Sequence, residues 1–163
     1  MVLDNIMHVL STTEWLGKKR ARLGELLKAW QAVDANQLSS GLEDKTNNDM
    51  PLGQILIAKG WLDEETLAEA IAFQSELPRA HITQDQILQS ASLMPLNVCI
   101  RFRVIPFSKQ ENNKLCIATA NPLTDEKLVQ LEKTINCPVE QFIVRENEIR
   151  TGLRILRGKS HQQ

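Results

Sequence analysis

Residues 22–34 read RLGELLKAWQAVD, and residues 51–63, which lie 29 positions later, read PLGQILIAKGWLD. The two stretches share a Leu-Gly pair near their start and an aspartate at their end. The correspondence continues beyond them, since Leu38 matches Leu67 and Leu42 matches Ile71 at the same offset. Two similar units so close together predict two similar half-sites, and therefore a ligand with two similar halves.

Each copy has the pattern of a helix hairpin. Between Leu23 and Val33, apolar residues recur every three or four positions, which is typical of one amphipathic helix. Asp34 then stands where the N-cap of a second helix is expected, and Asp63 has the same place in the second copy. Gly60 can adopt the left-handed conformation that ends a helix, whereas the first copy has a glutamine at the equivalent position. The first part of the chain is therefore predicted to be two tandem helix hairpins.

The pattern changes from helical to alternating after residue 98. Strands are predicted at residues 103–107, 114–119 and 138–144, and helices at residues 124–134 and 146–157. The stretch 75–98 is predicted to connect the two parts, with one short helix at residues 84–93. The fold class is therefore α+β, with a small ββαβα subdomain after the helical one. The predicted parts are an N-terminal helix and basic linker at 1–21, a tandem-motif helical subdomain at 22–79, an α/β subdomain at 80–157 and a polar tail at 158–163.

The charge balance argues against a general DNA or RNA binder. The 163 residues include 19 Lys and Arg against 20 Asp and Glu, a net charge of −1, whereas proteins that bind nucleic acid through its phosphates are markedly basic. Lys18, Lys19, Arg20, Arg22 and Lys28 nevertheless gather at the first copy. This group can hold a small anion; it can also be a linker, a membrane-facing anchor or the solvated end of a helix.

Metal, disulfide and membrane-spanning roles are not expected. Cys99, Cys116 and Cys137 lie far apart in apolar or strand-like settings, as reduced core residues of a cytoplasmic protein do. The three histidines have no Cys or carboxylate partner at metal-ligand spacing. No segment approaches the roughly 20 apolar residues of a membrane span, and no signal peptide is evident. We therefore expect a cytoplasmic domain, either free or tethered to the inner membrane through a parent protein.

The sequence carries no set of residues typical of a catalyst. It lacks the Gly-x-x-x-x-Gly-Lys-Ser/Thr loop of a P-loop ATPase. No nucleophile, base and orienting residue stand together, and the stretch around His81 has no visible partner. We therefore expect a binding module without a cofactor rather than an enzyme.

The two copies resemble the tandem motif of the MshEN family, the regulatory domain at the N-terminus of the MshE pilus ATPase and similar to that of type II secretion ATPases. The family motif has an Arg-Leu-Gly start, leucines farther along the hairpin and a closing Gln. The matching residues are Arg22-Leu23-Gly24, Leu27, Leu38, Leu42 and Lys45 in the first copy and, after five residues, Pro51-Leu52-Gly53, Leu56, Gly60, Leu67, Ile71 and Gln74 in the second. Residues 103–106 and 115–123 in the second half are also similar to the family.

The resemblance implies that the chain binds cyclic di-GMP, a bacterial second messenger with two guanines and two phosphates in one ring. Glycines at a helix start let a phosphate approach the backbone N–H groups. Leucines one turn apart can form an apolar surface against a purine, and Arg or Gln can form hydrogen bonds with the edge of a guanine. The expected ligand-binding residues are Arg20, Arg22, Leu23, Gly24, Leu38, Leu42, Lys45, Leu52, Gly53, Leu67, Ile71, Gln74 and Asn121.

Several positions depart from the family pattern. Lys45 replaces the closing Gln of the first copy, and Pro51 replaces the arginine of the second, so that the second half-site lacks its cation. Asn121 stands where the resemblance implies an acidic residue, and it brings no charge. These changes predict unequal half-sites. On spacing alone, the leucines of both copies are more typical of an ordinary helix-hairpin core than of a ligand surface.

The resemblance therefore predicts a cyclic di-GMP-binding regulatory domain that controls an attached or partner bacterial enzyme of secretion, pilus or exopolysaccharide machinery. The alternative is a degenerate domain of the same fold that no longer binds nucleotide and docks a protein instead. The residues before Arg22 and the polar tail are expected of a domain at the C-terminus of a larger parent. A bacterial inner-membrane glycosyltransferase of the phage-adsorption kind is one such parent.

Overall fold

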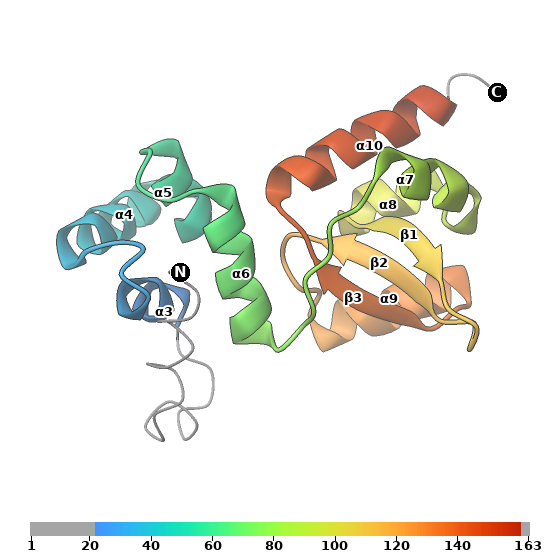
Figure 1. Ribbon diagram of the computed structural model, residues 1–163, viewed down its shortest axis with the longest axis horizontal. Coiled ribbons are helices and arrows are strands. Elements are labelled where there is room, and N and C mark those ends of the chain that lie inside the picture. Colours follow the sequence, from blue (N-terminus) through green and yellow to red (C-terminus); the bar gives the residue numbers. More distant parts are fainter. Residues whose placement is uncertain (1–21, 161–163) are drawn as a thin grey trace. The chain divides into compact units, whose positions relative to one another are not determined.

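The computed structural model describes residues 22–160 (Figure 1). The chain divides into two compact units, Met1–Ala70 and Ile71–Gln163, and the border between them falls inside helix α6, Glu64–Ser75. The first unit carries the tandem repeat as far as Ala70, and the second carries the end of α6 and a mixed sheet with its helices. The predicted α+β class is confirmed, while the N-terminal helix predicted within residues 1–21 lies outside the described residues.

The repeat predicted from the sequence is present in the backbone of the first unit. Helix α3, Leu23–Ala29, corresponds to helix α5, Leu52–Ala58, and both have seven residues. Helix α4, Ala35–Asn47, corresponds to α6. The apolar residues that recur along α3 and α5 are buried, and the main ones are Leu26, Leu27, Ile55 and Leu56. Two tandem helix hairpins are therefore confirmed.

Both first helices end in the same way. The N–H groups of Gln31 and Ala32 donate to the carbonyls of Lys28 and Leu27 at 3.0 Å each, which is the Schellman pattern of a helix end. The equivalent N–H groups in the second copy make the same two bonds, at 2.9 and 3.0 Å. This ending needs a left-handed residue, and the φ angles are +59° at Gln31 and +76° at Gly60. The glutamine therefore occupies, at a conformational cost, the place that the second copy gives to glycine.

The aspartates that follow act as the predicted caps. Asp34 Oδ1 accepts from the Gln37 N–H at 2.7 Å, and the Gln37 side chain accepts from the Asp34 N–H at 3.0 Å, which completes a capping box. Asp63 accepts from the Thr66 N–H at 2.6 Å and from its hydroxyl at 2.9 Å. Each hairpin thus turns over a short link that is fixed by one left-handed residue and one capped helix start.

The second unit is built on a three-stranded sheet with the order β1-β2-β3. Strand β1, Ile105–Lys109, runs antiparallel to β2, Leu115–Thr119, with an irregular register between Pro106 and Ser108. Strand β3, Val139–Ile143, runs parallel to β2, as the arrows of Figure 1 show. Helix α9, Asp125–Ile135, makes the connection between these two parallel strands, and Thr124 caps it through the Lys127 N–H at 3.3 Å.

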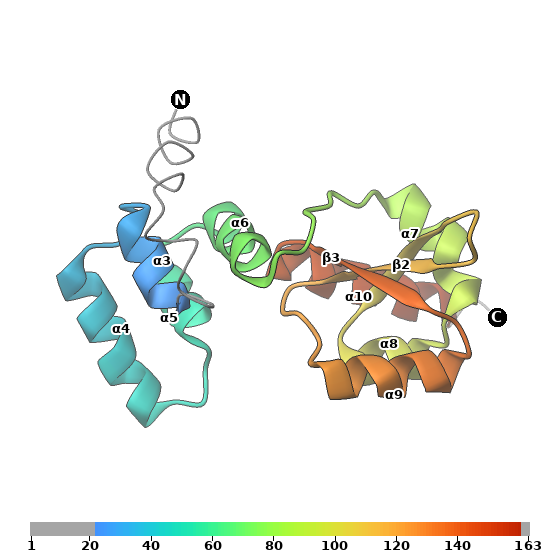
Figure 2. The same ribbon diagram turned by 90° about the horizontal axis from the view of Figure 1, so that it is seen from below.

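Four further helical segments complete the second unit: α7 (Gln84–Ser90), the short 3-10 helix η1 (Ala91–Leu93), α8 (Leu96–Phe102) and α10 (Glu146–Ser160). Helices α8 and α9 contact each other and lie on the same side of the sheet (Figure 2). Helix α10 packs on α7, α8, β1 and β2. Its Gly152 lies against Ile105 so closely that no side chain would fit without movement.

Two details of the sequence prediction were wrong. Residues 96–102 were not predicted to be helical, and the first strand begins at Ile105 instead of residue 103. The second error follows from the first, because Arg103 is the left-handed residue (φ +54°) that ends α8. The Val104 N–H then donates to the Cys99 carbonyl at 3.0 Å, and the strand starts only after this turn.

The cysteines are all free thiols, as predicted. Cys99 and Cys116 are buried, and Cys137 is half-buried. Burial raises the pKa of Cys99 from 9.0 to about 12, with a smaller opposing effect of a backbone hydrogen bond. The Cys99 thiol is therefore a small apolar group of the core rather than a nucleophile.

Candidate functional site

The two motifs start from nearly identical backbone frames. Arg22 precedes α3 with φ −61° and ψ 146°, and Pro51 precedes α5 with φ −58° and ψ 146°. The carbonyl of each residue accepts the first hydrogen bond of its helix, at 3.1 Å from Leu26 and 3.1 Å from Ile55. Both starting residues are exposed. The arginine side chain and the proline ring are therefore the main difference between two equivalent positions.

The glycine of each motif lies directly on the second helix of its own hairpin. A Cβ atom added to Gly24 would lie 2.8 Å from Leu38 Cδ1, and one added to Gly53 would lie 2.6 Å from Leu67 Cδ1. Contacts this short leave no room for a methyl group. The glycines therefore let a leucine of the following helix pack on the start of the preceding one, a role that the sequence pattern left open.

A third glycine, which the sequence reasoning missed, joins the two hairpins. Gly41 lies in α4, and an added Cβ would be 3.0 Å from Leu56 Cδ2 and 3.1 Å from Leu52 Cδ1. Leu52 thus contacts the first hairpin from the start of the second, and it is buried. The only sequence signal for this role was a glycine in the middle of a helix, where it is otherwise unfavourable.

The predicted apolar ligand surface differs between the copies. Leu38 is half-buried and Leu42 is 47% exposed, whereas Leu67 is 5% and Ile71 is 9% exposed. Leu23 is half-buried as well. The leucines of the first copy are therefore partly or largely exposed, while the matching side chains of the second copy are buried.

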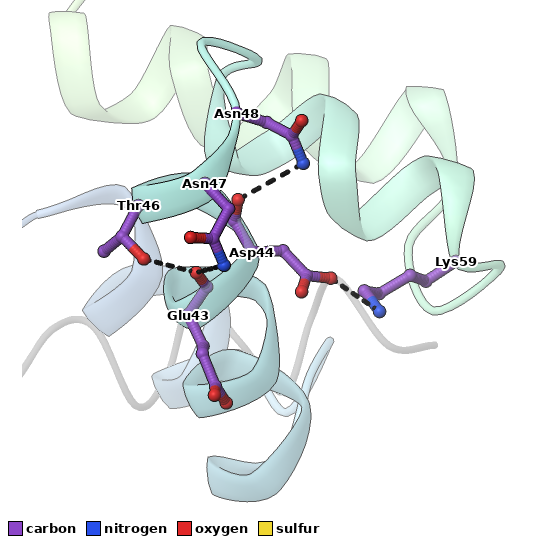
Figure 3. Close-up of polar contacts among 6 residues, drawn as sticks. All are labelled: Glu43, Asp44, Thr46, Asn47, Asn48 and Lys59. Atoms are coloured by element: carbon purple, nitrogen blue, oxygen red, sulfur yellow. Dashed lines mark hydrogen bonds and ion pairs between the residues drawn. The ribbon is translucent and has the colours of Figure 1, made fainter.

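Figure 3 shows the end of α4, where the first motif closes. The Glu43 carbonyl accepts from the Thr46 hydroxyl at 2.6 Å, and the Asp44 carbonyl accepts from the Asn48 side-chain amide at 3.4 Å. Asp44 Oδ2 also lies 2.7 Å from Nζ of Lys59, the residue that ends α5. Side chains therefore add hydrogen bonds to two carbonyls in the last turns of α4, and an ion pair links this end of the first hairpin to the second.

The remaining predicted residues belong to three different segments of the chain. Lys45 is exposed in the last turn of α4, seven residues after Leu38. Gln74 is half-buried near the end of α6. Asn121 is exposed after β2, and its carbonyl accepts from the Thr119 hydroxyl at 2.6 Å. Arg20 lies outside the described residues.

Within residues 22–160, no group of three His, Cys, Asp or Glu side chains is placed to hold a metal ion. In the same part of the chain, no helix has the length and hydropathy needed to cross a bilayer.

Comparison with known proteins gives the family. The MshEN domain family matches residues 75–163, more than half of the chain. The chain belongs to the MshEN domain family. This match begins where the tandem repeat ends, so that it rests on the sheet and its helices and not on the two glycine motifs.

Solved structures extend the likeness of this MshEN domain to the helical part. A structure of MshE with cyclic di-GMP is 28% identical to it, with a TM-score of 0.66, and covers 83% of this chain and 98% of that chain. The N-terminal domain of XpsE, at 16% identity and a TM-score of 0.61, covers 82% of this chain and 92% of that one and shares its fold.

Curated relatives are much longer than this MshEN domain. Bacteriophage adsorption protein B of Escherichia coli K12 is 29% identical over 133 residues, which is 81% of this chain. Bacteriophage N4 adsorption protein B of Escherichia coli O157:H7 matches equally well. The chain spans only 18% of the length of either relative.

Proposed function

We propose that this MshEN domain binds cyclic di-GMP and regulates a larger bacterial protein of which it is a part. The observation that carries the proposal is its likeness to MshE solved with cyclic di-GMP, at 28% identity over 83% of this chain. The repeated backbone frames of α3 and α5 support it independently, because they offer two equivalent half-sites to a ligand with two equivalent halves. Relatives several times longer than this chain support a regulatory part within a larger protein.

The first half-site is the stronger one in this proposal. Leu38, Leu42 and Lys45 follow one another at i, i+4 and i+7, and therefore share one face of α4. The contact between Gly24 and Leu38 brings the start of α3, where Arg22 is exposed, to the same face. A purine lying on the two leucines would have one cation for its O6 and N7 edge and another for a phosphate.

The second half-site keeps the frame but offers less to a ligand. Leu67, Ile71 and Gln74 have the same i, i+4 and i+7 spacing on α6. The two apolar side chains are buried, however, and Pro51 supplies neither a positive charge nor an N–H donor. We expect this half to hold the second guanine through the Gln74 amide and backbone groups, with a smaller share of the binding free energy.

One observation favours the alternative of a protein-docking domain. The side chains that would face the second guanine are buried, and the cation of that motif is absent. A domain that lost nucleotide binding would retain the hairpins, because the glycine and leucine contacts hold them together without a ligand. Ligand-induced stabilisation separates the two functions.

The test is thermal unfolding of the chain with and without cyclic di-GMP, beside cyclic di-AMP. A ligand present at about 100 times its Kd stabilises the folded protein by about 2.7 kcal/mol, so the proposal predicts a clear rise of the Tm with cyclic di-GMP alone. Arg22→Ala should abolish the rise. Arg154→Ala, which removes an exposed arginine of α10, is the matched control and should retain it. A docking domain would show no rise with either nucleotide.

A further inference from the structure

Helix α10 of the second unit has a basic stripe on an exposed face. Arg150, Arg154 and Arg157 follow one another at i, i+4 and i+7, and all three are exposed. Residues at this spacing share one face of a helix, and these three span about 10 Å along its axis. Another face of α10 is buried in the core of the second unit through Ile149 and Leu153. The three arginines therefore form one row on the solvent side of the helix.

The acidic residues of α10 lie at its start. The side chains of Glu146 and Glu148 are only 13% and 12% exposed. Glu146 is paired with Arg103 and Glu148 with Arg145, so that both negative charges are compensated. From Ile149 to Ser160 the helix has no Asp or Glu. The stretch that carries the basic stripe therefore has a net positive charge.

Helix stability accounts for only part of this pattern. The helix dipole favours cations in the last turn, and its effect fades within that turn. Arg157 and Lys159 lie there. Lys159 Nζ also donates to the Leu88 carbonyl at 2.9 Å, and so fixes the end of α10 to α7. Arg150 and Arg154 precede the last turn, so that the dipole does not explain them.

The composition of the exposed face decides which kind of partner fits it. A stable interface between proteins has an apolar core inside a polar rim. A surface of anionic lipid headgroups needs no apolar core, because it attracts each nearby Lys or Arg through charge. Between residues 147 and 158, the exposed residues of α10 are Asn147, Arg150, Thr151, Arg154, Arg157 and Gly158, and none of them is a large apolar residue. This face therefore fits a headgroup layer better than a protein.

We propose that the basic stripe of α10 binds the phosphate headgroups of anionic lipids at a membrane surface. Arginine suits this contact, because its guanidinium is always charged and binds phosphate oxygens. Three arginines give weak attraction, so that the contact is reversible and is screened by salt. The proposal is independent of nucleotide binding, because the stripe contains no residue of the tandem repeat.

Two double variants of equal net charge provide the test. Arg154→Gln with Arg157→Gln removes two cations from the stripe. Lys127→Gln with Lys133→Gln, the matched control, removes two exposed cations from α9. Glutamine is a good helix former, so that both variants should fold, and unfolding curves verify this. A third variant, Arg154→Lys with Arg157→Lys, retains both charges without the planar guanidinium.

The assay is sedimentation of the full chain with vesicles of phosphatidylglycerol and phosphatidylcholine in equal parts, beside vesicles of phosphatidylcholine alone. At an ionic strength of about 0.01 M, the parent chain should sediment with the anionic vesicles only. A cation near an anionic surface is worth about fivefold in binding, so the stripe variant should bind about 25-fold more weakly. The α9 variant and the lysine variant should bind nearly as well as the parent. At about 1 M salt, the binding of the parent should be lost.

The contrary results are equally definite. If the folded parent chain does not sediment with the anionic vesicles, the stripe has no affinity for a lipid surface and the proposal is wrong. If the stripe variant binds as well as the parent, other cations account for the binding. If the α9 variant loses as much as the stripe variant, the effect is one of overall charge. Equal losses in the glutamine and lysine variants would show that the guanidinium fork is required, as it is for a partner's carboxylates, and would also overturn the proposal.

Discussion

Replacing Gln31 by glycine should stabilise the first unit. Gln31 has φ +59° and occupies the left-handed position of a Schellman ending, whose two hydrogen bonds of 3.0 Å are already in place. An L-residue pays roughly 1–2 kcal/mol in this conformation, and glycine avoids that strain but loses roughly 0.5–1 kcal/mol through the greater freedom of its unfolded chain. The net gain expected for Gln31→Gly is therefore about 0.5–1 kcal/mol.

The equivalent position in the second copy supplies the reverse experiment. Gly60 has φ +76°, and an added Cβ would meet no atom within 4 Å, so that only the backbone conformation resists a side chain there. Gly60→Gln should therefore cost about as much as Gln31→Gly gains. Gln31→Ala is the matched control, because alanine still has a Cβ and should bring no comparable gain.

Tryptophan fluorescence during thermal unfolding is the suitable assay. Trp30 and Trp61 adjoin the two positions, and the third tryptophan of the chain, Trp15, also belongs to the first unit. A gain of 1 kcal/mol raises the Tm of a domain of 60–100 residues by about 4–8 °C, so a rise of a few degrees is expected for Gln31→Gly. Equal Tm values for Gln31→Gly and Gln31→Ala, or a fall for the glycine variant, would refute the equivalence of the two hairpin ends.

Three further predictions concern packing, binding and reactivity. Gly53→Ala should lower the free energy of unfolding by about 1–2 kcal/mol in urea, because the new methyl group would meet Leu67, which is only 5% exposed and has little room to move. Gly24→Ala should lower it by less, because Leu38 is only half-buried. Pro51→Arg restores a cation to the second motif, and the backbone angles of Pro51 match those of Arg22 in the first. This variant should bind cyclic di-GMP about tenfold more tightly in calorimetry. Unchanged affinity would mean that this position does not face the ligand. Cys99, with a pKa of about 12, should resist alkylation by iodoacetamide at pH 8 in the folded chain and should react after denaturation. Mass spectrometry measures this labelling. Rapid labelling of the native protein would contradict the burial of Cys99.

The helical unit could be predicted in detail because its signals are local. Leucine spacing, the aspartate caps and a glycine at a helix end each depend on residues within one turn. The first two signals occur in both copies, and the glycine occurs in the second. The role of Gly24 and Gly53 could not be predicted in this way. Their contacts with Leu38 and Leu67 lie across a hairpin, and sequence spacing alone does not distinguish them from glycines that admit a ligand.

Helix α8 was missed for a similar reason. Its residues include Val98, Cys99, Ile100 and Phe102, which favour strands, and the segment is only seven residues long. Its formation depends on packing against α9 and α10, which no local pattern indicates.

The two motifs differ in the side chains that they expose, and the proposed binding of cyclic di-GMP would be unequal for that reason. Arg22 and Lys45 accompany the exposed leucine face of the first copy, while the second copy has buried apolar side chains and Pro51. A symmetric ligand would then be held unequally, with most of the binding free energy at the first motif.

The most direct test of the central claim is a calorimetric titration of this chain with cyclic di-GMP, run beside cyclic di-AMP and GTP. Binding of micromolar strength or tighter, about −8 kcal/mol or better, that is selective for cyclic di-GMP is the predicted result. A flat titration with folded protein would contradict the account, and would mean that Lys45 and Pro51 have removed the nucleotide from a fold that now serves to dock a protein.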